Sequence, residues 1–330
     1  MEPIWITEAE VVELMHLGQA IDALESGLKL EAAGQAQNMV KTHVKWEGGH
    51  TLHAIGATFE GAGVFGTKTW GHTAGGATPL LIIWDSATGN LRAIIEAFAL
   101  GQMRTGGISG VATKWMAAPD ASDMALIGTG KQAITQVAAV AAVRDLKRIR
   151  VYSPRPESRE QFAAHLRGQG FDFEVMTTDS VSSATEGASI VTAVTRAQQP
   201  FICADNLAKG THLNAVGAIT PEREEFTQDV FDRAGLIAGD NPAAVAKLSR
   251  EFMTYYEAPT HDWNAVKPLC DLVAGGAGRS EDIDISLFKA MGMGISDLSL
   301  GLVVLNEALA QGKGCAIPHP QRVQPRLRAV

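Results

Sequence analysis

A glycine-rich turn at residues 128–133 has the spacing of a nucleotide-binding loop. Four apolar residues, Met124–Ile127, run into Gly-Thr-Gly-Lys-Gln-Ala, which fits the pattern G-x-G-x-x-G/A with alanine in the third position. The first glycine permits a tight strand-to-helix turn, the second lets backbone N–H groups approach a pyrophosphate, and the small third residue lets the helix pack close to the sheet. The pattern predicts dinucleotide binding, with a purely structural turn as the alternative. The residues expected at the cofactor are Gly128, Thr129, Gly130, Lys131 and Gln132.

The end of the next apolar run bears on which dinucleotide binds. An acidic residue at this position normally accepts hydrogen bonds from the adenosine ribose of NAD, whereas a nearby arginine accommodates the extra phosphate of NADP. Here the run ends at Tyr152 and continues as Ser153, with Arg155 and Arg159 close behind. These residues favour NADP(H), while NAD(H) stays possible. The alternative interpretation is that both arginines are solvated residues at the start of a helix.

The apolar runs around the turn alternate between strand-like and helix-like patterns. The strand-like runs are MALIG, RIRVYS and FEVMT, the helical runs between them are QAITQVAAVAAVRDL and ESREQFAAHLRGQG, and later come SIVTAV, THLNAVGA and GLIAGD. Alternation of this kind implies parallel strands joined by crossover helices. We therefore expect an α/β fold with a Rossmann-type, doubly wound parallel sheet. A strand precedes the glycine turn and a helix follows it, as a dinucleotide site requires.

The first third of the chain has a different organisation. After a strand-like IWIT, residues 8–34 have the apolar spacing of an amphipathic helix or helix pair. Residues 39–85 form short runs separated by glycines, which predict an antiparallel sheet. The turn-rich DSATGN joins the last of these runs to LRAIIEA, so a hairpin is expected there. An open sheet of this kind leaves edges and an apolar face, which predicts a homodimer formed through this domain.

Two further segments are predicted to be helical. Residues 97–117 have a helical pattern despite their glycines, and Ala118-Pro119-Asp120 ends it just before the dinucleotide strand. Residues 285–314 also show helical apolar spacing throughout, and we expect them to return onto the first domain. A length of 330 residues itself favours two domains over a single core.

Composition restricts the class of partner. The net charge is −8 and no block of Lys or Arg is present, which argues against nucleic-acid binding. Small molecules are the expected partners. No apolar run reaches the roughly 18 residues of a spanning helix, and the N-terminus carries acids rather than a basic leader, so we expect a cytoplasmic protein without membrane contact. Cys203, Cys270 and Cys315 lie far apart without metal-ligand spacing, so neither a disulfide framework nor a metal site is expected.

Five motifs, taken together and in order, resemble the ornithine cyclodeaminase and mu-crystallin family over nearly the whole chain. They are VFGTKTW, LGQMRTGGISGVATKWMA, IGTGKQA, THLNAVGA and FKAMGMGISDLSLG. The resemblance implies a homodimer that binds NAD(H) or NADP(H) and acts on a small α-amino or α-imino acid. It also implies an α+β substrate-binding and dimerisation domain, formed by residues 1–118 with 300–330, and a Rossmann domain over residues 119–299.

The resemblance assigns catalytic roles to Lys68 and Arg104. Lys68, in GTKTW, matches the family's active-site lysine, and a cationic donor near an imine nitrogen or carboxylate polarises the C=N bond. Arg104, in MRTGG, matches the arginine that clamps the substrate carboxylate, which a planar guanidinium grips bidentately. Thr105 is placed to bond a cofactor phosphate. The remaining expected cofactor contacts are Thr78, Arg104, Val194, Thr195, Val216, Gly217, Ala290 and Met291.

The expected substrate pocket departs from the family pattern at one position, and the assignment of its other residues stays open. Many members have a second carboxylate-binding arginine where this chain has Lys41, which neutralises the same charge with looser geometry. His43 and His53 are near in sequence, and His53 is a candidate substrate contact, although a hydrogen-bonded sheet histidine is the commoner outcome. The glycine-rich residues 71–79 are expected to border the pocket.

A second departure bears on the reaction. Cyclodeaminases of the family carry a catalytic aspartate after the VGG/VGA turn, where this chain has Ile219. Ammonia expulsion needs a base to take protons from nitrogen, whereas reduction of a preformed iminium needs hydride delivery, a carboxylate anchor and a donor near nitrogen. We therefore expect an NAD(P)H-dependent imino-acid reductase or amino-acid dehydrogenase. The alternatives are a cyclodeaminase, if Glu222, Glu224 or Glu225 substitutes for the aspartate, and a nucleotide-dependent binding protein.

Overall fold

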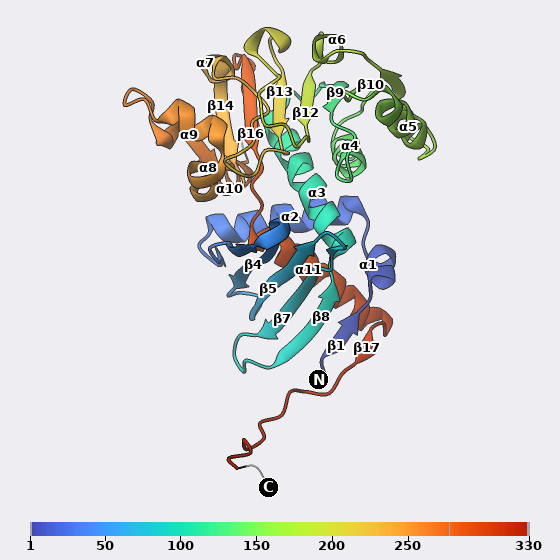
Figure 1. Cartoon of the computed structure of the whole chain (residues 1–330), viewed down its shortest axis with the longest axis vertical. Coiled ribbons are helices and arrows are strands. Elements are labelled where there is room, and N and C mark those ends of the chain that lie inside the picture. Colours follow the sequence, from blue (N-terminus) through green and yellow to red (C-terminus); the bar gives the residue numbers. More distant parts are fainter. Residues whose placement is uncertain (1, 277, 329–330) are drawn as a thin grey trace.

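The computed structural model describes residues 2–276 and 278–328 and contains two sheets, which Figure 1 shows in separate halves of the molecule. The first sheet has the strand order β17-β1-β8-β7-β5-β4-β2, with β3 paired to β4 and β6 paired to β5. Its pairs are antiparallel except for β1 with β8. Its strands are β1 (Ile4–Ile6), β2 (Ala36–Asn38), β3 (Thr42–Trp46), β4 (His50–Phe59), β5 (Val64–Thr73), β6 (Gly76–Ala77), β7 (Leu80–Asp85), β8 (Leu91–Glu96) and β17 (Cys315–Ala316).

The second sheet is parallel throughout and has the order β11-β10-β9-β12-β13-β16-β14-β15. The strands are β9 (Asp123–Ile127), β10 (Arg148–Tyr152), β11 (Glu174–Thr177), β12 (Ile190–Ala193), β13 (His212–Ala215), β14 (Ala234–Gly239), β15 (Val266–Pro268) and β16 (Ile285–Lys289). From β9 the chain extends to β10 on one side, and β12 lies on the other. This reversal is the topological switch point at which doubly wound sheets bind ligands. The predicted fold class is confirmed.

The helices of the first half cover one face of its sheet. They are α1 (Glu8–Leu14), α2 (Leu17–Ala32), α3 (Phe98–Met116) and α11 (Gly294–Gln311). The predicted helix pair over residues 8–34 is confirmed, with Thr7 and His16 capping the two N-termini. The remaining helices belong to the second half: α4 (Ala133–Ala141), α5 (Pro156–Arg167), α6 (Val181–Thr185), α7 (Asp229–Arg233), α8 (Pro242–Leu248), α9 (Arg250–Tyr256) and α10 (Leu269–Gly275).

Helix α3 joins the two halves, and its glycines have a packing role. The helix contacts α2 and α11 on one side and α4, β13 and β16 on the other (Figure 1). A Cβ atom at Gly106 would lie 2.5 Å from the carbonyl oxygen of Thr135 in α4, so only glycine allows this approach. The predicted helix over residues 97–117 is therefore confirmed, and its low helix propensity is offset by close packing.

The prediction of one continuous helix over residues 285–314 is wrong for its first part. Residues Ile285–Lys289 form strand β16, between β13 and β14, and the helix begins only at Gly294. All five residues of β16 are buried. A strand covered on both faces carries no polar alternation, so a short apolar run of this kind is indistinguishable from a buried helix by periodicity. The return of the chain to the first sheet through α11 is as expected, and the exact domain boundaries stay a proposal.

The face of the first sheet that points away from the helices is partly open. Along β7 the side chains of Leu81 and Ile83 are buried, whereas the alternating Ile82 and Trp84 stay partly exposed. Phe65 on β5 stacks on Trp84, with ring centroids 5.5 Å apart. Apolar side chains thus occupy a sheet face that no layer formed by the described residues covers. In the part of the chain that the structure describes, no helix combines the length and the apolar character needed to cross a bilayer.

Candidate active site

The predicted cofactor residues come together at the carboxyl edge of the parallel sheet. Gly128 follows β9 and Ser153 follows β10. The pairs Val194–Thr195, Val216–Gly217 and Ala290–Met291 follow β12, β13 and β16. Because the carboxyl ends of parallel strands meet at one edge, positions as far apart in the sequence as Gly128 and Met291 form one crevice here.

The glycine turn has the geometry that a pyrophosphate needs. Gly128 has φ of 111°, and a Cβ atom there would lie 2.7 Å from the carbonyl oxygen of Val194. At Gly130 a Cβ atom would meet no protein atom within 4 Å, so the backbone faces open space. Helix α4 begins directly after the turn at Ala133, and its free N–H groups and dipole favour an anion. The residues present therefore fit a dinucleotide.

Glu225 holds two of the carboxyl-edge loops together. Its Oε1 accepts hydrogen bonds from the N–H (2.7 Å) and hydroxyl (2.8 Å) of Thr195, and its Oε2 accepts the N–H groups of Gly217 (2.8 Å) and Ala218 (3.1 Å). Burial raises the pKa of Glu225, and the Lys289 charge and these donors act in the opposite direction. Both carboxylate oxygens are thus committed to holding the loops after β12 and β13 in place.

The other two glutamates considered as substitutes for the missing aspartate are also engaged elsewhere. Glu224 lies 3.3 Å from the guanidinium of Arg250. Glu222 is exposed, and its carboxylate lies 4.0 Å from the ammonium of Lys45. Ile219 itself packs against the apolar core of the second half. This part of the loop therefore presents an apolar side chain where the family's cyclodeaminases carry an acid.

A buried lysine, aspartate and arginine form the centre of the site. Lys68 on β5 donates a hydrogen bond to Oδ1 of Asp297 at 2.5 Å, and Nε of Arg104 lies 3.4 Å from the same oxygen. Lys68 and Asp297 are 4% and 1% exposed. The second carboxylate oxygen, Oδ2, is buried and has no hydrogen-bond partner among the described residues. Three elements far apart in sequence, β5, α3 and α11, supply these groups.

The electrostatics of this cluster suit proton transfer near neutral pH. Burial lowers the pKa of Lys68 from its ordinary value to about 8, the Asp297 charge raises it, and the Arg104 charge lowers it. A group with a pKa near the working pH both donates and accepts a proton readily. Lys41 belongs to the same electrostatic cluster, because burial and the Arg104 charge lower its pKa while Asp240 and Asp297 raise it.

Asp240 connects the arginine to the cofactor edge. It follows β14, and its carboxylate accepts the N–H groups of Met291 (2.8 Å) and Gly292 (2.7 Å). Gly292 packs so closely on Arg104 that a Cβ atom would lie 2.7 Å from Nη1. Burial raises the pKa of Asp240, and the two backbone donors and the Arg104 charge oppose this shift. The turn after β16 thus fixes the position of the guanidinium.

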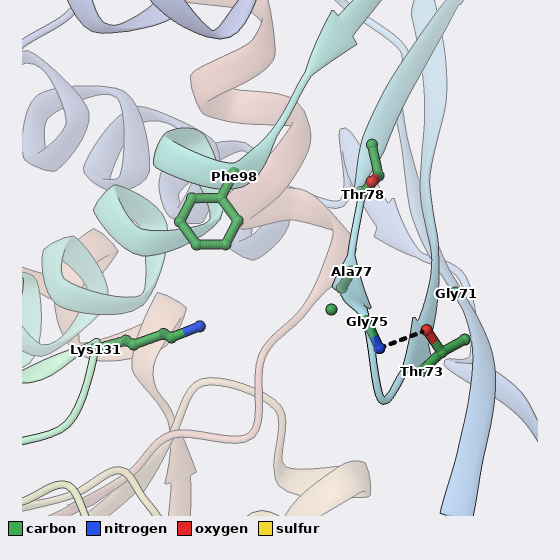
Figure 2. A pocket seen from close by; sticks show the side chains of 8 residues that line it. Gly71, Thr73, Gly75, Ala77, Thr78, Phe98 and Lys131 are labelled. Carbon is green, nitrogen blue, oxygen red and sulfur yellow. Dashed lines mark hydrogen bonds between the residues drawn. The ribbon is translucent and has the colours of Figure 1, made fainter.

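A cavity of about 500 Å³ lies between the two halves of the site. Residues 71–78 of the β5–β6 region border it on one side, with Phe98 of α3 and Lys131 of the glycine turn on the other. Figure 2 shows the Lys131 side chain extending toward the loop that carries Gly75, while the Gly75 N–H donates to the Thr73 hydroxyl (3.2 Å). The glycine-rich loop, Thr78 and Lys131 therefore border one space, although they come from different domains.

Some of the predicted cofactor residues have side chains that are free to reach a ligand, whereas others form hydrogen bonds within the protein. The hydroxyl of Thr105 donates to the carbonyl of Gly101 at 2.8 Å within α3. Arg159 donates to the carbonyl of Ser153 at 3.1 Å, whereas Arg155 is exposed at the start of α5. Asp240 and Asp297 were not predicted. The signal in the sequence that could have identified Asp297 is an acidic residue within the apolar run 285–309.

The fold and the site together define a two-domain protein of the NAD-binding oxidoreductase type, with a dinucleotide crevice facing a buried lysine, aspartate and arginine. A model of the ornithine cyclodeaminase/mu-crystallin family matches residues 1–312. The chain belongs to this family, as its motifs predicted.

One curated enzyme and two solved structures are especially similar. The alanine dehydrogenase of Archaeoglobus fulgidus is 27% identical over 324 residues, covering 96% of this chain and 98% of that enzyme. The Δ1-pyrroline-2-carboxylate reductase of Thermococcus litoralis, solved with NADH and L-proline, superposes with a TM-score of 0.89 at 25% identity, covering 95% of this chain and 100% of that one. An archaeal alanine dehydrogenase dimer with bound NAD gives 0.86 at 25% identity, covering 96% and 99%. Their names describe two different activities, alanine dehydrogenase and Δ1-pyrroline-2-carboxylate reductase.

Proposed function

We propose that this protein reduces a small α-imino acid with NAD(P)H, or oxidises the corresponding amino acid. The observation that carries the proposal is the buried contact of Lys68 with Asp297 beside Arg104, set against the dinucleotide crevice. Reduction of a C=N bond requires a cationic proton donor, an anchor for the substrate carboxylate and an environment that excludes water.

Each group has a distinct role in this reaction. The Arg104 guanidinium, with Lys41 nearby, binds the substrate carboxylate and orients the α-carbon. The dinucleotide, when bound at the glycine turn, supplies the hydride that reaches that carbon. The ammonium of Lys68 gives its proton to the imine nitrogen, so that one hydride and one proton convert C=N to CH–NH. Asp297 keeps Lys68 protonated and in position until the transfer.

Cyclodeamination is the second candidate and the loop after β13 disfavours it. That reaction removes protons from nitrogen before ammonia leaves, and Ile219 offers no base at the family's aspartate position. A nucleotide-dependent binding protein is the third candidate. It has no need of a lysine held with a pKa near neutrality beside an arginine, so the cluster favours an enzyme.

Cofactor stoichiometry separates these candidates. For the reducing direction, the protein is incubated with NADH or NADPH and either a cyclic ketimine or a 2-oxo acid plus ammonium. The absorbance of the reduced nicotinamide is followed. For the reverse direction, the protein is incubated with amino acids and the oxidised cofactors. A reductase consumes one reduced cofactor for each amine formed. Ammonia release from L-ornithine with no net change in cofactor establishes the cyclodeaminase instead, and cofactor binding without turnover of any substrate establishes the binding protein.

We predict that NADPH binds more tightly than NADH. The relatives above hold NAD or NADH, so this preference rests on the residues of this chain alone. Ser153 places no negative charge beside a 2′-phosphate, and the exposed Arg155 can pair with it. Fluorescence titration of both cofactors is the measurement, with Arg155→Ala expected to weaken NADPH and spare NADH. Lys147→Ala, at an exposed cation elsewhere on the domain, serves as the control. Equal affinities in the wild type would remove the preference.

We also predict a homodimer that covers the open face of the first sheet. Phe65, Ile82 and Trp84 lie there without a covering layer, and a second copy would bury them. Sedimentation equilibrium at micromolar concentration should give twice the chain mass. Ile82→Lys should shift the protein toward the monomer, whereas Val12→Lys, on an exposed surface of α1, should leave the dimer intact. A monomeric wild type contradicts this arrangement.

A further inference from the structure

Beyond Lys68, the same face of the first sheet carries two more rows of polar and aromatic side chains. Side chains directly opposite each other on paired strands share a face, as do alternate residues along one strand. Lys68 pairs with Ile55. The next two rows, each taken across β5, β4 and β3, are Trp70, His53, His43 and then His72, Thr51, Lys45. Because a strand rises about 3.3 Å per residue, neighbouring rows lie about 7 Å apart.

The middle row contains a hydrogen-bonding atom without a partner. The rings of His53 and Trp70 stack with centroids 4.8 Å apart, and the rings of His43 and His53 stack at 5.5 Å. Nε2 of His53 lies 2.8 Å from the hydroxyl oxygen of Thr51. Nδ1 of His53 is buried and has no partner among the described residues. With the Thr51 hydroxyl donating to Nε2, the imidazole proton sits on Nδ1, which is then a donor without an acceptor.

The charges around this row are mainly positive. Burial lowers the pKa of His53 to about 4, and Coulombic interactions with Lys41, His43, His72 and Lys45 act in the same direction. His53 is therefore neutral at physiological pH, and its Nδ1 donates a hydrogen bond in the tautomer in which the Thr51 hydroxyl donates to Nε2. The carboxylate of Glu222 lies 4.0 Å from the ammonium of Lys45, and both side chains are largely exposed. Such a field attracts an anion and repels a cation.

Resting on the reductase function proposed above, we infer that the substrate carries a second carboxylate, on its side chain, bound by Nδ1 of His53 and the ammonium of Lys45. Arg104 and Lys41 hold the α-carboxylate, and Lys68 faces the nitrogen. A side chain with one or two methylenes then brings its carboxylate to the middle row. Lys45 leaves the exposed Glu222 and turns to the substrate. The substrate class is thus a short dicarboxylic α-imino or α-amino acid. A cationic side chain such as that of ornithine meets repulsion here.

Binding calorimetry in the presence of saturating oxidised cofactor tests this inference. L-aspartate is compared with L-asparagine, and L-glutamate with L-glutamine, because each pair differs in charge and hardly in size. Whichever of aspartate and glutamate binds more tightly should bind at least about tenfold more tightly than its own amide. A charge-assisted hydrogen bond in a partly buried site provides a difference of this size. The ratio should fall toward one in Lys45→Gln and in His53→Phe, which keeps a ring in the stack. Lys147→Gln, distant from the site, should keep the wild-type ratio.

Two patterns of failure are distinguishable. Equal binding of acids and amides, or a ratio unchanged in Lys45→Gln, overturns the inference, and turnover of neutral amino or imino acids would then leave the reductase function standing. Charge-dependent binding without turnover of any amino or imino acid in either direction overturns the reductase function and retains the anion subsite. Because Lys45 is exposed, its substitution tests the subsite without disturbing the fold.

Discussion

Replacing Asp297 with asparagine should lower kcat/KM for imine reduction by about two orders of magnitude or more. The side chain keeps its size but loses the charge that stabilises the ammonium of Lys68 at 2.5 Å. Removing one partner of a buried charge pair typically costs about 2–5 kcal/mol, and each factor of ten in rate corresponds to about 1.4 kcal/mol. Steady-state kinetics with either reduced cofactor measures the loss.

The pH profile of this variant identifies the cause. Burial already lowers the pKa of Lys68 to about 8, and Asp297 raises it, so loss of the Asp297 charge moves this pKa further down. Reduction needs the protonated lysine, so the wild-type rate falls as pH rises through about 8 and the rate of the variant falls at a lower pH. Oxidation needs the neutral lysine and shows the opposite dependence. An unchanged profile with near-normal kcat/KM would remove Asp297 from the mechanism.

A matched substitution on the same helix controls for general effects. Glu307 also lies on α11, where its carboxylate accepts an exposed hydrogen bond from Gln311. Glu307→Gln makes the same change of carboxylate to amide away from the site, and it should leave both the rate and the pH profile as in the wild type.

Lys68→Ala and Arg104→Ala should each remove nearly all turnover while leaving cofactor binding nearly intact. Lys68→Ala removes the proton donor and leaves Asp297 buried beside a single cation, and Arg104→Ala removes the bidentate anchor for the carboxylate. We expect a loss of about two to three decades in kcat/KM for each variant. The glycine turn belongs to the other sheet, so fluorescence titration should give a cofactor affinity close to that of the wild type.

A conservative variant and a fold control separate chemistry from stability. Lys68→Arg retains a cation beside Asp297 but is a poor proton donor at neutral pH, so it should preserve the thermal transition and still lose turnover. Lys147→Ala, on the surface of the second half, should retain full activity. Ordinary turnover in Lys68→Ala would exclude the lysine from the reaction, and collapse of cofactor binding in that variant would assign the lysine a structural role.

The sequence determined the parallel sheet because its signals are local. The spacing of glycines at residues 128–133, with a strand before and a helix after, depends only on backbone geometry over a few residues. The glycine-rich helix and the hairpin after β7 could be predicted for the same reason, because their signals also lie within one short segment. The error at residues 285–289 has the same origin, since a fully buried strand lacks the polar alternation that distinguishes it from a helix.

The members of the buried charge cluster could be predicted from the sequence only in part. Lys68 and Arg104 lie in motifs whose order along the chain resembled one family, so their importance could be predicted from the sequence. The partner that sets the protonation of Lys68 lies 229 residues away, and no local pattern pairs these two positions. Glu225 shows the converse case, because an acid considered as a base proved to hold two backbone loops.

By itself, then, the sequence determined the fold class, the nucleotide turn and two of the charged residues, because each depends on short-range spacing or on motif order. Only the tertiary structure decided which charges meet. Burial removes Lys68 and Asp297 from water, and in that environment the distance between two charged groups determines their pKa values and their chemistry. Distances between β5, α3 and α11 are set by sheet register and helix packing, which no single segment of the chain encodes.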